Sequence, residues 1–149
     1  MRMYFCGSIR GGRQDVAIYQ RIVRKLQEFG LVLTEHVSHA DVSERGEDVE
    51  LQGDLAIHDR DMQWLHTADV VVAEVTQPSL GVGYEVGRAV DMQKKILCLF
   101  RPSSGQVLSA MIRGADDGSP NSFVQVRDYA EDEVETVLDT YFSTFSSTV

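Results

Sequence analysis

Short, uninterrupted apolar runs, separated by stretches of helical periodicity, constrain the fold of this chain more than any other feature. The clearest run begins Val70-Val71-Val72-Ala73. Such runs are typical of strands covered on both faces, because a strand with one solvent-facing side would carry a polar residue at every second position. The runs predict five strands, at Met3–Cys6, Leu31–Thr34, Val70–Val75, Ile96–Phe100 and Phe123–Val126.

The segments between these runs have the apolar spacing of amphipathic helices. The first predicted helix covers Asp15–Phe29, and we expect Gly30 to end it. Its inner stripe consists of Tyr19, Ile22, Val23 and Leu26. A last helix has an aromatic-rich stripe that indicates core packing, formed by Val134, Val137, Leu138, Tyr141, Phe142 and Phe145.

Strands that alternate with helices predict a parallel sheet with helices on both faces. We therefore expect residues 1–149 to form one α/β domain, a Rossmann-like or flavodoxin-like three-layer sandwich with a five-stranded parallel sheet. In such folds ligands bind beyond the carboxyl ends of the strands, near the point where the strand order reverses. Residues that directly follow a predicted strand are therefore the first candidates for a functional site.

The charge of the chain limits its partners. With 23 acidic and 14 basic residues the formal net charge is −9, which argues against general binding to nucleic acid, because that needs a basic face. A small anionic ligand remains compatible with this charge, since arginines are concentrated locally. Arg10 and Arg13 flank two glycines, and Arg101 and Arg113 lie in or near a second segment that contains Gly and Ser.

Hydropathy and cysteine content indicate the compartment. No apolar run approaches the ~20 residues that span a bilayer, and the N-terminus lacks the pattern of a signal peptide. We therefore expect no membrane association and a cytoplasmic location, with the nucleus as a further candidate. Cys6 and Cys98 each lie in an apolar run and are interpreted as core residues in a reducing compartment.

One segment, Glu35–Gly53, fits no predicted helix or strand. A segment of that length is usually a functional lid or disordered, and the sequence leaves both interpretations open. His36 and His39 lie within it, and His58 is followed by two aspartates, but neither group has the ligand spacing of a zinc site. We expect no catalytic metal.

The first predicted strand is followed by a glycine-rich loop, Gly7-Ser8-Ile9-Arg10-Gly11-Gly12-Arg13. Glycines let backbone N–H groups approach an anion, and arginine adds a forked donor that suits phosphate. The loop matches neither the dinucleotide pattern G-x-G-x-x-G nor the phosphate loop G-x-x-x-x-G-K-[ST], which disfavours a nicotinamide or ATP enzyme. An ordinary turn from strand to helix is the alternative.

The third predicted strand is followed by a tight loop and a helix that we expect to start near Val82. Glu85 lies three residues after Val82 and four before Ala89, which places it on the inward face of this helix. A buried carboxylate is costly unless it is paired or used. Glu85 is therefore a candidate functional residue, and the alternative is an acid that caps the first turn of the helix.

A second acid has a similar position. Asp61 is four residues from both Ile57 and Leu65, so that in a single helix it would lie on the inner stripe. Two carboxylates in one cleft suggest acid/base or nucleophilic chemistry at a glycosidic carbon. The alternative is an acid that pairs with a nearby arginine.

Ser109 is a polar residue within an apolar helical turn, between Val107 and Ile112. Its hydroxyl could bond to its own helix backbone or donate to a phosphate. The residue pattern favours the backbone bond.

Three segments closely resemble the 2'-deoxynucleoside 5'-phosphate N-hydrolases, which belong to the nucleoside 2-deoxyribosyltransferase superfamily. They are Tyr4–Arg13, Ala68–Glu85, and Ile96–Pro102 together with Leu108–Gly114. The resemblance extends from about Met3 to Phe142.

The resemblance implies a dimeric, cofactor-free enzyme that cleaves the N-glycosidic bond of deoxyribonucleoside monophosphates to a free base and 2-deoxyribose 5-phosphate. By the same resemblance Glu85 matches the nucleophile, Asp61 the second catalytic carboxylate, and Tyr4 the hydroxyl that orients the nucleophile. The matched substrate residues are Gly7, Ser8, Ile9 and Arg10 in the first loop, His36 in the pocket, and Ser79, Gly81, Ser109 and Met111. Ser109 and Met111 would come from the neighbouring subunit, and 5-hydroxymethyl-dUMP is a candidate substrate.

Two rival functions remain at this point. A deoxyribosyltransferase would pass the same glutamyl-bound sugar to another base, although the serines favour a phosphorylated substrate and hence the hydrolase. A non-catalytic nucleotide-binding module would use the same pocket. Such a module would gain nothing from two inward acids, Glu85 and Asp61.

Overall fold

The computed structural model of this chain describes residues 1–9, 15–34, 36 and 49–146. Within these residues five parallel strands hydrogen-bond in the order β2-β1-β3-β4-β5. Their bounds are β1 Arg2–Cys6, β2 Leu31–Val32, β3 Val70–Glu74, β4 Lys95–Phe100 and β5 Val124–Asp128. This is the flavodoxin-like order, whose direction reverses between β1 and β3, and it confirms the predicted α/β class.

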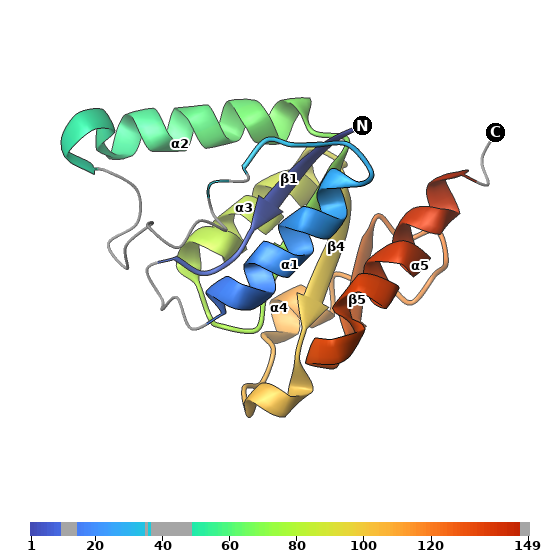
Figure 1. The fold of residues 1–149 in the computed structure, drawn as a ribbon. Coiled ribbons are helices and arrows are strands. Elements are labelled where there is room, and N and C mark those ends of the chain that lie inside the picture. The colour runs from blue at the N-terminus through green and yellow to red at the C-terminus, as the bar shows by residue number, and fades with distance from the viewer. Residues whose placement is uncertain (10–14, 35, 37–48, 147–149) are drawn as a thin grey trace.

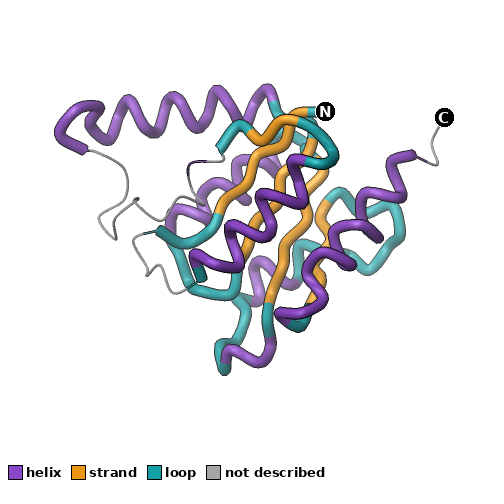
Figure 2. Tube along the Cα trace, viewed as in Figure 1, coloured by secondary structure: helices purple, strands orange, loops and turns teal. Residues whose placement is uncertain are grey.

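Helices cover both faces of the sheet (Figures 1 and 2). One face packs against α1 (Val16–Gln27) and α5 (Val134–Ser146), and the other against α2 (Val49–Thr67) and α3 (Leu80–Asp91). Shorter helical turns complete the chain, namely η2 (Pro102–Ser104), α4 (Ala110–Arg113) and η3 (Glu131–Glu133). None of the described helices combines the length and the apolar character that a membrane span requires.

Alternation along each strand divides the core into two clusters. On β1, Met3 and Phe5 pack with α1 and α5, whereas Tyr4 and Cys6 pack on the α2 and α3 side. Successive side chains of a strand point to opposite faces. The polar residues at the carboxyl edge of the sheet are therefore divided between two faces as well.

Side-chain hydrogen bonds explain two boundaries that differ from prediction. Strand β2 ends at Val32, and the hydroxyl of Thr34 then accepts from the backbone N–H of Phe5 at 2.8 Å and donates to its carbonyl at 2.6 Å. Thr34 thus binds backbone groups of β1 that a longer β2 would have paired. Helix α3 begins at Leu80 rather than near Val82, because Ser79 caps it by accepting from the N–H of Val82 at 3.2 Å.

The structure corrects two further predictions and leaves a third untested. Helix α1 ends at Gln27, and Gly30 does not adopt a left-handed cap; a Cβ there would lie 2.2 Å from the carbonyl oxygen of Met1. Part of the segment predicted to be irregular is helical, because α2 begins at Val49, with non-helical angles at Gly53. Residues 35 and 37–48 lie outside the described residues, so the lid interpretation remains a prediction.

The glycine that ends β1 yields a stability prediction. A Cβ on Gly7 would lie 2.7 Å from Cζ of Tyr19, a fully buried ring, so Gly7→Ala should lower the free energy of unfolding by about 1–3 kcal/mol. The matched control is Gly87→Ala within α3, where no atom lies within 4 Å of the new Cβ. Removal of a helical glycine should raise that energy by about 0.5–1 kcal/mol. Urea unfolding measures both, and a Gly7→Ala variant as stable as the wild type would refute the close contact.

Candidate active site

The hydroxyl of Tyr4 donates a hydrogen bond to Oε2 of Glu85, across the space between β1 and α3. Tyr4 is fully buried, and Glu85 is half-buried on α3 beside the apolar stripe of that helix. The predicted inward position of Glu85 is therefore confirmed. Its hydrogen-bond donor, Tyr4, comes from β1, next to the reversal of strand order.

The surroundings of Tyr4 keep its hydroxyl protonated. Burial raises the pKa of Tyr4 well above its usual value, and the charges of Glu85 and Asp61 raise it further. Burial also raises the pKa of the Cys6 thiol, and the same two carboxylates contribute to that increase. Both acids therefore lie near enough to the α2- and α3-facing side of β1 to act electrostatically on Tyr4 and Cys6.

Asp61 also pairs with a nearby arginine, as the alternative interpretation of this residue predicted. Its Oδ1 accepts from Nε and Nη2 of Arg60 at 3.1 and 2.9 Å, and its side chain is 22% exposed. The guanidinium of Arg60 lies 4.6 Å from the centre of the Trp64 ring, which in turn lies 5.8 Å from the ring of His36. Asp61 therefore lies on the same side of the sheet as Tyr4 and Glu85, and its carboxylate is paired with Arg60.

The predicted phosphate residues lie around a groove of about 630 Å³ between the start of α3 and the segment that contains α4. Ser79, Ser109 and Met111 line it, and the exposed Gly81 lies in the first turn of α3. The hydroxyl of Ser109 accepts from the N–H of Met111 at 3.2 Å. This is the backbone bond that the sequence favoured, made here as an N-cap.

Tyr4, Glu85 and Asp61 are not among the residues that line the groove, although Val82, one turn before Glu85 on α3, is. Within one chain, the structure therefore brings Tyr4, Glu85 and Asp61 together, and gathers Ser79, Ser109 and Met111 around the groove.

The loop after β1 begins among buried groups. Ser8 is fully buried, its backbone carbonyl accepts from the hydroxyl of Tyr19 at 3.3 Å, and its own Oγ has no hydrogen-bond partner within the part of the chain that the structure describes. Ile9 packs at the edge of the α1 and α5 core. The predicted substrate residue Arg10, with 11–14, lies outside the described residues.

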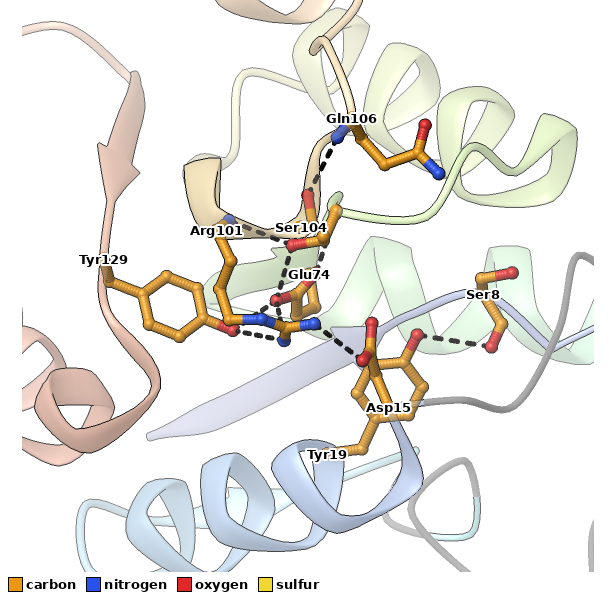
Figure 3. A network of polar contacts seen from close by, with 9 residues as sticks. Ser8, Asp15, Tyr19, Glu74, Arg101, Ser104, Gln106 and Tyr129 are labelled. Atoms are coloured by element: carbon orange, nitrogen blue, oxygen red, sulfur yellow. Dashed lines mark hydrogen bonds and ion pairs between the residues drawn. The ribbon is translucent and has the colours of Figure 1, made fainter.

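A buried polar network was missed by the sequence analysis (Figure 3). Glu74 is fully buried at the end of β3 and accepts from the N–H of Thr76 at 2.7 Å, from Nη1 of Arg101 at 3.3 Å and from the hydroxyl of Tyr129. Nη2 of Arg101 also pairs with Oδ1 of Asp15 at 2.6 Å. Burial raises the pKa of Glu74 despite these hydrogen bonds. The signal in the sequence was a carboxylate inside an apolar run.

The remaining candidates have partners of their own. His58 contacts Asp59 through Nδ1 at 2.9 Å and the hydroxyl of Tyr84 through Nε2 at 2.8 Å. Among the residues that the structure describes, no group of three His, Cys, Asp or Glu could hold a metal ion. Cys6 and Cys98 are buried free thiols, which confirms their predicted place in the core.

Several known proteins are similar to this chain in sequence or in fold. A 5-hydroxymethyl-dUMP N-hydrolase of Esox lucius is 69% identical over 146 residues, covering 98% of this chain and 99% of that protein. The human enzyme of the same name is 65% identical over 140 residues, or 94% of this chain and 78% of that protein. A solved CMP N-glycosidase of Clostridium botulinum, BcmB, has the same fold, with a TM-score of 0.69 at 21% identity over 95% of this chain and 99% of that one.

The sequence model of the family described as nucleoside 2-deoxyribosyltransferase matches residues 3–122. That range includes all of β1 except its first residue, both acids and the serines around the groove. With this match, and with relatives of such high identity over 78–99% of their length, the chain belongs to the nucleoside 2-deoxyribosyltransferase family.

Proposed function

We propose that this chain hydrolyses the N-glycosidic bond of 2'-deoxynucleoside 5'-monophosphates, with 5-hydroxymethyl-dUMP among its substrates. The products are a free base and 2-deoxyribose 5-phosphate. The names of relatives at 65–69% identity support the substrate class. The observation that carries the chemistry is the Tyr4 hydrogen bond to Glu85, with Asp61 on the same side of the sheet.

In the first step a carboxylate oxygen of Glu85 attacks C1' of the sugar. The bond between C1' and the base nitrogen breaks, its electron pair leaves with the base, and Asp61, which must enter this step as the protonated acid, delivers its proton to that base. Tyr4 holds Oε2 of Glu85 in a fixed direction, so that the attacking group is oriented before substrate arrives.

In the second step Asp61 takes a proton from water, and the water oxygen attacks C1'. The bond from C1' to Glu85 breaks and its electron pair returns to the carboxylate. The Tyr4 hydroxyl favours this departure, because it binds the charged carboxylate more strongly than the neutral ester. A deoxy sugar is easier to cleave by this route, since it has no electron-withdrawing 2'-hydroxyl beside the developing positive charge.

The phosphate of the substrate supplies binding energy away from the reacting carbon. We assign it to Ser8, Ser79 and Ser109. Ser8 is suited to this role because its buried Oγ has no partner among the described residues. Ser79 precedes the N-terminus of α3, where partial positive charge favours an anion.

The enzyme is proposed to be a homodimer whose groove is covered by the second copy. Leu80, Val107 and Met111, which are 97, 92 and 83% exposed, all line the groove. Apolar side chains gathered in this way favour a protein interface. Because the residues that line the groove do not include Glu85 or Asp61, Ser109 and Met111 are proposed to complete the site of the other chain, where pairing of two copies would let them approach its acids.

We predict that Glu85→Gln keeps the fold and lowers base release by about 1,000-fold or more, because an amide cannot act as the nucleophile. Chromatography of deoxynucleoside monophosphates, including 5-hydroxymethyl-dUMP, measures base release. Ribonucleotides and unphosphorylated nucleosides serve as controls for sugar and phosphate. Undiminished turnover in the variant would remove Glu85 as nucleophile. Formation of a new nucleotide when a second free base is added would favour the transferase instead.

Mixing a variant that binds substrate weakly with a variant that is inactive tests the shared site. Ser109→Ala should raise KM for the nucleotide, and Glu85→Gln should abolish turnover. In a mixed dimer one site combines the intact Glu85 of one chain with the intact Ser109 of the other. Refolding the two variants together should therefore restore about a quarter of wild-type sites at low substrate concentration. Absence of any recovery, in a mixture shown to form mixed dimers, would mean that Ser109 serves the site of its own chain.

A further inference from the structure

Arg101 joins the ends of three elements on the face of the sheet opposite Glu85. It follows β4 directly and its side chain is 10% exposed. Its backbone N–H donates to Oγ1 of Thr76 at 3.0 Å, and its Nη1 donates to Glu74 at 3.3 Å and to the hydroxyl of Tyr129 at 3.1 Å. The guanidinium is thereby fixed relative to the carboxyl ends of β3 and β5.

The fourth contact of this arginine leads to the substrate loop (Figure 3). Nη2 of Arg101 lies 2.6 Å from Oδ1 of Asp15, the N-cap residue of α1. The carbonyl of Asp15 accepts from the N–H of Tyr19 at 2.9 Å, and the hydroxyl of Tyr19 donates to the carbonyl of Ser8 at 3.3 Å. The contacts therefore run from Arg101 through the first turn of α1 to Ser8.

The polar groups along this path are incompletely satisfied. Oγ of Ser8 and Oδ2 of Asp15 are buried and have no hydrogen-bond partner among the described residues. Buried polar atoms in native proteins are nearly always hydrogen-bonded, and a buried ion pair is often no more stabilising than apolar packing. Stability alone therefore gives little reason for a buried carboxylate at residue 15.

We infer that Arg101, acting through Asp15 and Tyr19, is a positioning residue that holds Ser8 in the orientation that binds the substrate. This inference rests on the proposed function, in which Ser8 binds the nucleotide. Arg101 does not touch the reacting atoms. It sets the distance between the start of α1 and the carboxyl edge of the sheet, and so determines where Ser8 meets the phosphate.

The test removes the contact at Asp15, because loss of Arg101 would leave two buried carboxylates without their cation. Serine is a favoured N-cap residue but is too short to retain the contact with Arg101, so Asp15→Ser keeps the start of α1. Asp15→Asn retains an acceptor oxygen for Arg101. The matched control is Glu135→Ser, which removes the 2.8 Å ion pair between Arg21 of α1 and α5.

Steady-state kinetics and calorimetry separate positioning from stability. We expect Asp15→Ser to raise KM and the nucleotide Kd about tenfold with kcat nearly unchanged, because substrate binding is lost uniformly. Asp15→Asn should recover most of this affinity. The control Glu135→Ser should lower Tm without changing KM. Should Asp15→Ser fail to fold, Tyr19→Phe removes the hydroxyl contact to Ser8 and should raise KM in the same way.

An unchanged KM in Asp15→Ser, or in Tyr19→Phe where that variant replaces it, would overturn the inference, as would an equal increase in Glu135→Ser. A wild-type enzyme that binds deoxynucleotide without base release would refute the proposed hydrolysis, and the Kd values of the same variants would still decide the inference. Failure of the wild type to bind deoxynucleotide would contradict both.

Discussion

The hydrogen bond from Tyr4 to Glu85 is the contact on which the rest of the site depends. A carboxylate beside the apolar stripe of α3 would be costly to desolvate without a partner. Tyr4 provides that partner from a fully buried position on β1. Because its pKa is raised by burial and by both acids, it remains a hydrogen-bond donor throughout the physiological pH range.

At the carboxyl edge of the sheet, the proposed catalytic residues lie on one face and the buried polar contacts that hold the strand ends lie on the other. On the α2 and α3 side, Tyr4, Glu85 and Asp61 form the proposed catalytic group. On the α1 and α5 side, Glu74 and Arg101 fix the strand ends. The loop after β1 begins at this edge and leads into α1, and through this connection Arg101 is proposed to position Ser8, a residue of the proposed binding site, without contact with the substrate.

Periodicity alone was sufficient to predict the sheet and the inward positions of Glu85 and Asp61, because both follow from the spacing of apolar residues. It did not predict that β2 would end at Val32 or that α3 would start at Leu80, since the hydroxyls of Thr34 and Ser79 decide those ends. Periodicity also did not predict the hydrogen-bond partners of Glu74. They come from segments 27 and 55 residues away in the chain, and only the folded sheet brings them together.

The central claim is that Glu85 forms a transient bond to C1'. Two displacements at that carbon retain its configuration, whereas direct attack by water inverts it. Methanol competes with water in the second step and gives a methyl glycoside, which, unlike the free sugar, does not interconvert between anomers. Proton NMR of the products formed from a β-deoxynucleotide in dilute methanol therefore gives a direct answer. We predict the β-methyl glycoside of 2-deoxyribose 5-phosphate, and formation of the α-anomer would contradict a transient bond to Glu85.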